Sequence, residues 1–79
     1  MSEDIEVYTT PSCPYCTKIK EWLDEKGHDY TEYNVAENKE KAKEMIQRTG
    51  RRGVPQTAIG DQVITGFNPA KLERAIEEA

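Results

Sequence analysis

Hydrophobic and polar residues alternate along residues 5–9, which read IEVYT, and this period of two predicts a β-strand. Residues 30–35 are rich in β-forming side chains and are predicted to form a second strand. Two further short strands are expected at 54–59 and 62–65, because Gly60-Asp61 between them suits the tight turn of a hairpin.

Apolar residues spaced three and four positions apart predict three helices between and after these strands. The first spans residues 14–26. The second lies between Asn38, which suits a helix cap, and Gly50, which suits a helix end. The third begins at Asn68-Pro69, a cap followed by a proline in the first turn. The side chains expected to face the core are Cys16, Ile19, Trp22, Leu23, Ala42, Met45, Ile46, Thr49, Leu72, Ala75 and Ile76.

The predicted order of elements is therefore βαβαββα. A strand, a helix and a strand in succession imply a parallel pair joined by a crossover, and the hairpin then adds two antiparallel strands. The expected fold class is α/β, with a mixed four-stranded sheet and helices on both of its faces. Because 79 residues can bury only one small core, we expect one domain over residues 1–79.

Charge and composition exclude several classes of function. The net charge is −4, and lysine and arginine alternate with glutamate, so the sequence offers no basic face for nucleic acid. The first residues, MSEDIEVY, lack the basic and apolar regions of a signal peptide, and no apolar run reaches membrane-spanning length. We therefore expect a cytoplasmic protein that acts as a monomer, away from membranes.

The chain has two cysteines, and both belong to the motif CPYC at residues 13–16. The motif lies between the first strand and the first helix, at the strand ends where open α/β sheets bind ligands. The positive end of the helix dipole favours a thiolate at Cys13, which makes Cys13 the candidate nucleophile. Cys16 lies one turn further along and is the candidate resolving thiol, which attacks a mixed disulfide formed by Cys13.

Three motifs together resemble the glutaredoxin family over nearly the whole chain. They are CPYC after the first strand, Gly53-Val54-Pro55 before the third, and a turn centred on Gly66 before the last helix. The resemblance implies a thioredoxin-like fold and a thiol-disulfide oxidoreductase that reduces protein disulfides. It also implies that Pro55 follows a cis peptide bond beside the cysteines. The backbone of Val54 would then pair with an extended substrate.

The resemblance leaves the electron donor open between glutathione and thioredoxin reductase, and it implies no tightly bound cofactor. Glutaredoxins commonly hold a glutathione carboxylate with a lysine where this chain has Thr10. They also carry acidic residues after the glycine turn, where this chain reads Phe67-Asn68-Pro69. The stretch TGFNP resembles instead the small glutaredoxin-like redoxins that take electrons from thioredoxin reductase. The candidate substrate-binding residues are Tyr15, Arg51, Val54, Pro55, Gly66, Phe67 and Asn68.

The same cysteines allow two metal-binding alternatives. Cys13, Cys16 and His28 imitate three ligands of a zinc finger, for which Glu32 would have to supply the fourth. An iron-sulfur cluster shared between two copies is the other alternative, because some glutaredoxins bridge a cluster with the first cysteine and glutathione.

Overall fold

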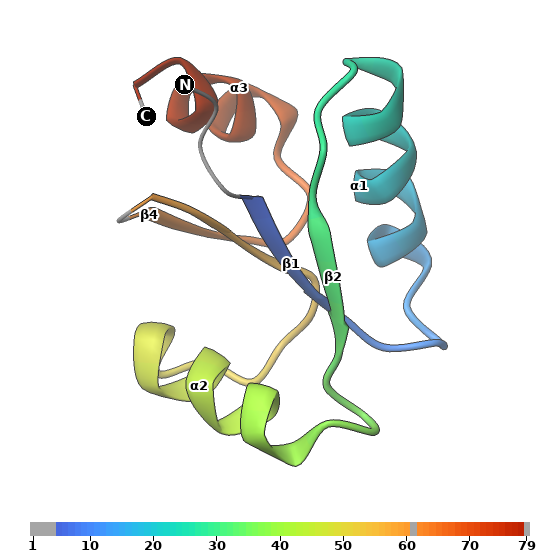
Figure 1. Ribbon diagram of the computed structural model, residues 1–79, viewed down its shortest axis with the longest axis vertical. Coiled ribbons are helices and arrows are strands. Elements are labelled where there is room, and N and C mark those ends of the chain that lie inside the picture. Colours follow the sequence, from blue (N-terminus) through green and yellow to red (C-terminus); the bar gives the residue numbers. More distant parts are fainter. Residues whose placement is uncertain (1–4, 61, 79) are drawn as a thin grey trace.

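The computed structural model describes residues 5–60 and 62–78. The elements in chain order are β1 (Ile5–Thr9), α1 (Pro14–Glu25), β2 (Thr31–Asn34), α2 (Lys39–Thr49), β3 (Gln56–Ile59), β4 (Gln62–Thr65) and α3 (Pro69–Glu78). This order confirms the predicted βαβαββα arrangement (Figure 1). In the predicted hairpin turn, Gly60 has a positive φ of 58°, and Asp61 lies outside the described residues.

The four strands form one mixed sheet in the order β2-β1-β3-β4. Strand β1 pairs in parallel with β2 and antiparallel with β3, and β3 pairs antiparallel with β4. All four side chains of β3 are buried, whereas β2 and β4 at the edges are partly exposed. The central strands β1 and β3 therefore carry most of the core.

Helices α1 and α3 cover one face of the sheet, and α2 covers the other (Figure 1). The larger hydrophobic cluster lies under α1 and α3, where Ile19 and Leu23 of α1 and Leu72 of α3 are fully buried. Partly buried Trp22, Tyr30, Phe67 and Ile76 pack against this cluster. The prediction that helices lie on both faces is confirmed.

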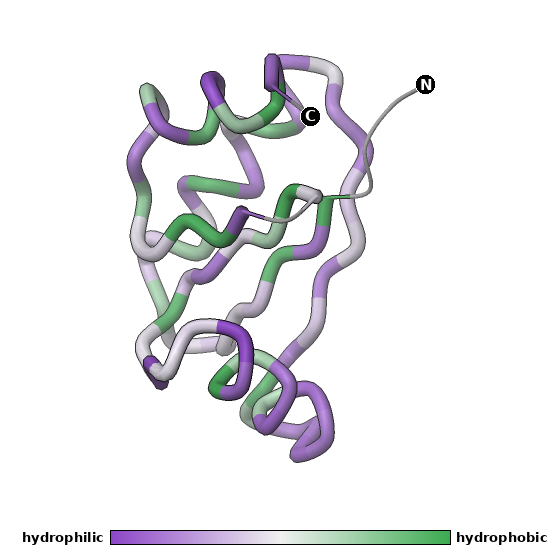
Figure 2. The backbone as a smooth tube through the Cα atoms, turned by 90° about the vertical axis from the view of Figure 1, so that its left-hand side faces the viewer, coloured by the Kyte–Doolittle hydropathy of each residue, from purple (hydrophilic) through white to green (hydrophobic). Residues whose placement is uncertain are grey.

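The face under α2 has a smaller apolar cluster, whose buried members are Tyr8, Met45 and Ala58. The backbone of α2 is coloured mostly hydrophilic (Figure 2). Of the side chains that were expected to face inward from α2, Met45 is buried and Ile46 is partly buried. Helix α2 thus gains less from apolar burial than α1 and α3 do.

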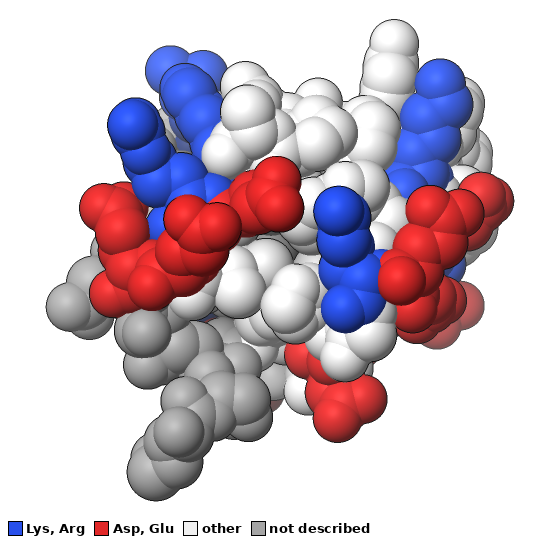
Figure 3. All heavy atoms as spheres, turned by 90° about the horizontal axis from the view of Figure 1, so that it is seen from above, with Lys and Arg blue, Asp and Glu red and all other residues white. Residues whose placement is uncertain are grey.

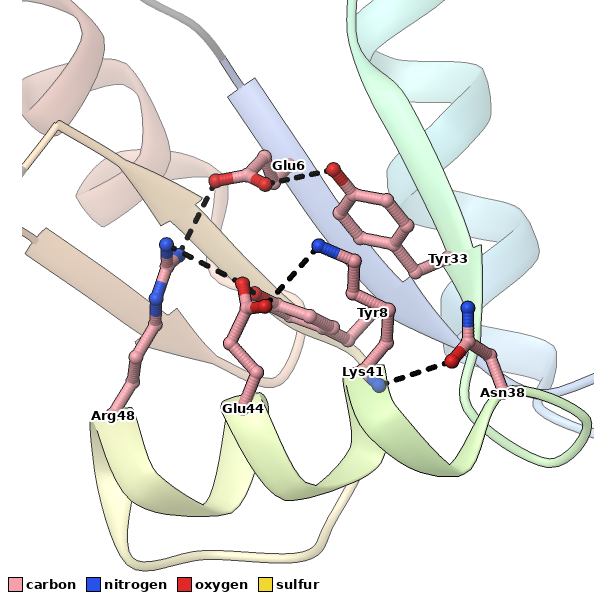
Figure 4. A network of polar contacts seen from close by, with 7 residues as sticks. All are labelled: Glu6, Tyr8, Tyr33, Asn38, Lys41, Glu44 and Arg48. Carbon is pink, nitrogen blue, oxygen red and sulfur yellow. Dashed lines mark hydrogen bonds and ion pairs between the residues drawn. The ribbon is translucent and has the colours of Figure 1, made fainter.

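Ion pairs and hydrogen bonds complete the attachment of α2 to the sheet (Figure 4). The hydroxyl of buried Tyr8 donates to Glu44 Oε1 at 2.9 Å, and the hydroxyl of Tyr33 donates to Glu6 Oε2 at 2.9 Å. Arg48 joins the two carboxylates, at 3.3 Å from Glu6 and 3.5 Å from Glu44. We call these five residues, together with Lys41, which pairs with Glu44 at 3.1 Å, the α2 clasp.

Charged side chains of both signs lie side by side over α1 and α3 when the molecule is seen from above (Figure 3). The described residues on this face form no continuous basic patch of the kind that binds a phosphate backbone. Among the helices of the described ranges, none is both long enough and apolar enough to span a membrane.

Candidate active site

The two cysteines lie where β1 passes into α1. Cys13 is the N-cap of the helix, and its Sγ accepts a hydrogen bond from the backbone N–H of Cys16 at 3.1 Å. Cys13 is partly exposed, whereas Cys16 is 1% exposed. Cys13 is therefore the more accessible of the two cysteines, and Cys16 is enclosed by the protein.

The environment of Cys16 opposes its ionisation. Burial is the main cause that raises the pKa of the Cys16 thiol, and its hydrogen bond with Cys13 raises it further. Cys16 therefore stays protonated at neutral pH in the reduced protein. Cys13, in contrast, occupies the cap position of α1, where its sulfur accepts the backbone N–H of Cys16.

The loop before β3 brings a backbone carbonyl to the first cysteine. The thiol of Cys13 donates to the carbonyl of Val54 at 3.7 Å. The Val54-Pro55 peptide bond is cis, and Pro55 is buried. The backbone N–H of Gly66 donates to the carbonyl of Pro55 at 2.9 Å, which joins the glycine turn to this loop. Two hydrogen bonds thus connect this loop to its neighbours: Val54 is joined to Cys13, and the next residue, Pro55, is joined to Gly66.

Two other predicted binding residues have partners inside the protein. Phe67 packs against the larger core cluster. The side-chain Oδ1 of Asn68 accepts from the backbone N–H of Lys71 at 3.2 Å, which caps α3. The side chains of Phe67 and Asn68 are therefore engaged in packing and capping.

Two predicted binding residues present their side chains to solvent. Tyr15 is 56% exposed, and the Nζ of Lys18 lies 5.2 Å from the centre of its ring. Arg51 is exposed, and its side chain forms no ion pair with any residue of the described ranges. These two side chains remain accessible to a substrate.

Gln56 is a buried polar residue that the sequence analysis did not single out. Its side chain is fully buried and forms hydrogen bonds with Thr49, Arg51 and Gly53 around the loop that carries Val54. The alternation of residues in the predicted strand could have identified Gln56. Gln56 alternates with Val54 and Ala58, so it is a polar residue on an otherwise apolar face of a predicted strand.

A carboxylate joins three elements near the end of β1. Glu32 Oε2 on β2 accepts from Thr9 Oγ1 at 2.7 Å and pairs with Lys20 Nζ of α1 at 3.0 Å. The hydrogen bond from Thr9 is the main cause that lowers the pKa of Glu32, and Lys20 lowers it further. Glu32 thereby ties β2 and α1 to the last residue of β1, four positions before Cys13.

We expect the Glu32→Gln variant to lose stability at neutral pH, by about 1 kcal/mol for a half-exposed charged hydrogen bond. Because the pKa of Glu32 is lower in the folded state than in the unfolded state, its stabilisation is present above the ordinary glutamate pKa of about 4.3. The stabilisation is lost as the pH falls through the folded-state value. Urea unfolding of both proteins between pH 7 and pH 3 measures this difference.

The matched control is Glu21→Gln, which removes an exposed carboxylate of α1 that makes no ion pair among the described residues. It is expected to change stability little at any pH. A stability difference between wild type and Glu32→Gln that stays constant down to pH 3 would contradict the proposed role of this carboxylate.

The structure gives no support to the zinc hypothesis. Among the described residues, no three histidine, cysteine, aspartate or glutamate side chains are grouped so that they could hold a metal ion. Cys13 and Cys16 lie at the amino end of α1, and His28 follows its carboxyl end. A helix of twelve residues separates its ends by roughly 18 Å, which is far beyond the size of a metal site.

Known proteins resemble this chain in both sequence and structure. The glutaredoxin family model matches residues 5–64. Glutaredoxin 3 of Escherichia coli K12 is 43% identical over 63 residues, which are 80% of this chain and 76% of that protein. An uncharacterized glutaredoxin-like 8.6 kDa protein in the rubredoxin operon of Clostridium pasteurianum is 39% identical over 74 residues, which are 94% of this chain and 99% of that protein.

Among solved structures, the glutaredoxin-like protein NrdH-redoxin from Escherichia coli superimposes with a TM-score of 0.78 and 30% sequence identity. The match covers 90% of this chain and 92% of that one, and the structure is described as the basis of a thioredoxin-like activity profile. The family match spans most of the chain, and the relatives align over most of their own lengths. The chain therefore belongs to the glutaredoxin family and is a glutaredoxin-like thiol-disulfide oxidoreductase.

Proposed function

We propose that the chain reduces protein disulfides by a dithiol mechanism in which Cys13 attacks the substrate and Cys16 resolves the mixed disulfide. The observation that carries this proposal is the unequal environment of the two sulfurs. Cys13 caps α1 and is partly exposed, and Cys16 is buried with a raised pKa. Of the two thiols, Cys13 is thus the more accessible, and its sulfur accepts a backbone hydrogen bond at the amino end of α1.

In the first step, the thiolate of Cys13 attacks one sulfur of the substrate disulfide. The substrate S–S bond breaks, a bond forms between Cys13 Sγ and that sulfur, and the other substrate sulfur leaves as a thiolate. The N–H of Cys16, which points at Cys13 Sγ at 3.1 Å, stabilises the attacking charge before the step. Attack by Cys13 leaves the protein as a mixed disulfide.

In the second step, Cys16 attacks Cys13 Sγ and gives up its proton to the departing substrate thiolate. The mixed disulfide breaks, the Cys13-Cys16 disulfide forms, and the substrate has gained two electrons from the protein, one proton from Cys16 and one proton from solvent, which protonates the thiolate released in the first step. Because burial keeps Cys16 protonated in the reduced protein, Cys16 does not compete with Cys13 for the substrate. An external reductant then returns two electrons to the Cys13-Cys16 disulfide.

The proposed substrate is an extended segment that contains a disulfide. Val54 lies directly before β3, and its carbonyl is 3.7 Å from Cys13 Sγ. A substrate backbone that pairs with Val54, as an added strand would, places its sulfur next to the nucleophile. Exposed Tyr15 and Arg51 are the further side chains that we propose to contact the substrate.

We expect iodoacetamide to modify Cys13 and to leave Cys16 unmodified in the reduced protein at neutral pH. Alkylation requires an accessible thiolate, and Cys16 is 1% exposed with a raised pKa. Mass spectrometry of the digested protein identifies the modified residue. In urea, both cysteines should react, which serves as the control. Equal modification of the two cysteines in the folded protein would contradict the division of roles.

We infer that thioredoxin reductase is a better electron donor than glutathione. Thr10 stands where the family commonly has a lysine for a glutathione carboxylate. The Oδ1 of Asn68 is engaged in capping α3, and residues 66–69 include no carboxylate that could hold the amine of the γ-glutamyl group. The likeness to a redoxin with a thioredoxin-like activity profile supports the same inference.

Two coupled assays with the same disulfide substrate test the function and its donor. One supplies NADPH and thioredoxin reductase, and the other supplies NADPH, glutathione and glutathione reductase. The expected result is faster consumption of NADPH with thioredoxin reductase. A faster rate with glutathione would overturn the donor inference, and substrate reduction in neither assay would overturn the proposed function.

A further inference from the structure

The loop that carries Val54 has little secondary structure of its own. It connects the end of α2 at Thr49 to the start of β3 at Gln56, and residues 50–53 are exposed. Gly50 has a positive φ of 71° and ends α2. Because exposed loop residues gain little from packing, other contacts must fix the path of this backbone.

The side chain of Gln56 supplies such contacts from inside the protein. Gln56 pairs with Tyr8 of β1, so its side chain points to the face of the sheet that α2 covers. Its Nε2 donates to the carbonyl of Arg51 at 2.9 Å and to the carbonyl of Gly53 at 2.8 Å. The side chain is fully buried, so no solvent competes for these hydrogen bonds.

Thr49 completes the arrangement at the last turn of α2. Its Oγ1 lies 2.9 Å from Gln56 Oε1 and accepts from the backbone N–H of Arg51 at 3.1 Å. The buried side-chain amide of Gln56 therefore donates two hydrogen bonds through Nε2 and accepts one through Oε1. We call the side chains of Thr49 and Gln56 the loop latch.

We propose that the loop latch positions the carbonyl of Val54 beside Cys13 and so sets the affinity for an extended disulfide substrate. The latch holds the carbonyl of Gly53 on one side of Val54, and the hydrogen bond from Gly66 holds the carbonyl of Pro55 on the other. Val54 is thus fixed from both sides, with its carbonyl 3.7 Å from Cys13 Sγ. Thr49 and Gln56 are positioning residues, because no hydrogen bond joins either of them to a cysteine sulfur.

The chemistry of an amide explains the choice of residue. A glutamate at position 56 has the same shape, but its carboxylate accepts hydrogen bonds and would face the carbonyl oxygens of Arg51 and Gly53. A leucine would remove the hydrogen bonds that Gln56 Nε2 donates to both carbonyls. Thr49→Val is the milder change, because it removes one hydroxyl from a half-buried position and keeps the shape of the side chain.

The test compares Thr49→Val with Thr49→Ser, which retains the hydroxyl, and with Gln56→Glu. Because the inference rests on the proposed function, two readouts are measured: KM for a disulfide-linked extended peptide, and the rate at which iodoacetamide modifies Cys13. Thr49→Val is expected to raise KM about tenfold, which corresponds to about 1.4 kcal/mol, the size of one hydrogen bond. The alkylation rate should change much less than KM, because Cys13 stays at the amino end of α1, and Thr49→Ser should stay close to wild type. Gln56→Glu should raise KM further.

Hydrogen exchange at the Arg51 amide provides a readout that does not depend on activity. That amide donates to Thr49 Oγ1, so its exchange should become faster in Thr49→Val and stay slow in Thr49→Ser. Unchanged KM and unchanged exchange in Thr49→Val would overturn the latch. If the variants slowed peptide reduction and alkylation of Cys13 equally, Thr49 and Gln56 would have only a structural role. A wild-type protein that reduces no disulfide would overturn the proposed function, while Arg51 exchange would still decide whether the latch holds the loop.

Discussion

Replacement of Cys13 by serine is expected to abolish disulfide reduction, by on the order of a thousandfold or more. A serine hydroxyl does not ionise at neutral pH, so the variant lacks the thiolate that attacks the substrate. Replacement of Cys16 by serine leaves Cys13 at the helix cap with its hydrogen bond from the backbone N–H at position 16, because that donor belongs to the main chain. The Cys16→Ser variant should therefore attack substrate and then accumulate as a mixed disulfide.

Intact-mass spectrometry after incubation with a disulfide peptide distinguishes the two variants. Cys16→Ser should gain the mass of one peptide thiol, and a reducing agent should remove it. Cys13→Ser should gain none, because its remaining thiol is buried. Both variants should unfold in urea close to the midpoint of the reduced wild type, which shows that the fold is intact. An adduct on Cys13→Ser, or equal reductase activity in the two variants, would contradict the assigned roles.

The Leu72→Ala variant is expected to lose about 2–5 kcal/mol of the free energy of unfolding. Leu72 is 0% exposed in the larger core cluster, where α3 packs against the sheet beside Ile64 of β4. The truncation removes apolar burial and leaves a cavity under a short helix. Small domains have a total stability of about 5–15 kcal/mol, so the variant should be much less stable at room temperature and unfolded at moderate urea concentrations. Urea unfolding followed by far-UV circular dichroism measures the change.

Ile76→Ala is the matched control on the same helix, because Ile76 is only partly buried against the same cluster. It should cost clearly less stability than Leu72→Ala. Leu72→Ala could instead lower the free energy of unfolding by less than about 1 kcal/mol, or by no more than Ile76→Ala does. Either result would show that burial of Leu72 is not a main contribution to the stability of the protein.

The order and type of the elements could be predicted because each segment carries a consistent local pattern. Asn38 and Gly50 mark the ends of α2, and both occupy the cap positions that their chemistry favours. The third strand begins at Gln56, two residues later than predicted, because the chain at Val54 and Pro55 forms a loop with a cis peptide bond instead of pairing in the sheet. Local patterns thus predicted the fold class and the approximate bounds of its elements.

The contacts of the candidate site were harder to predict, because they join residues that are distant in sequence. The spacing of the two cysteines predicted their place in the site. The carbonyl that faces Cys13 belongs to Val54, which lies 41 positions further along the chain. Sequence alone could not decide that Phe67 packs in the core or that the side chain of Asn68 caps α3. The role of Gln56 depends on three partners that only the folded loop brings together.

The α2 clasp has a consequence for how the molecule responds to salt. Its ion pairs are partly exposed, and such pairs weaken as ionic strength rises, whereas the apolar contacts under α1 and α3 do not. Added salt should therefore lower the cost of opening α2 before it affects the rest of the fold, and amide exchange in α2 should show this first. Since α2 leads into the loop of Val54 while Cys13 and Cys16 lie at the start of α1, added salt should loosen the proposed substrate-binding loop before it affects the helix that positions the two thiols.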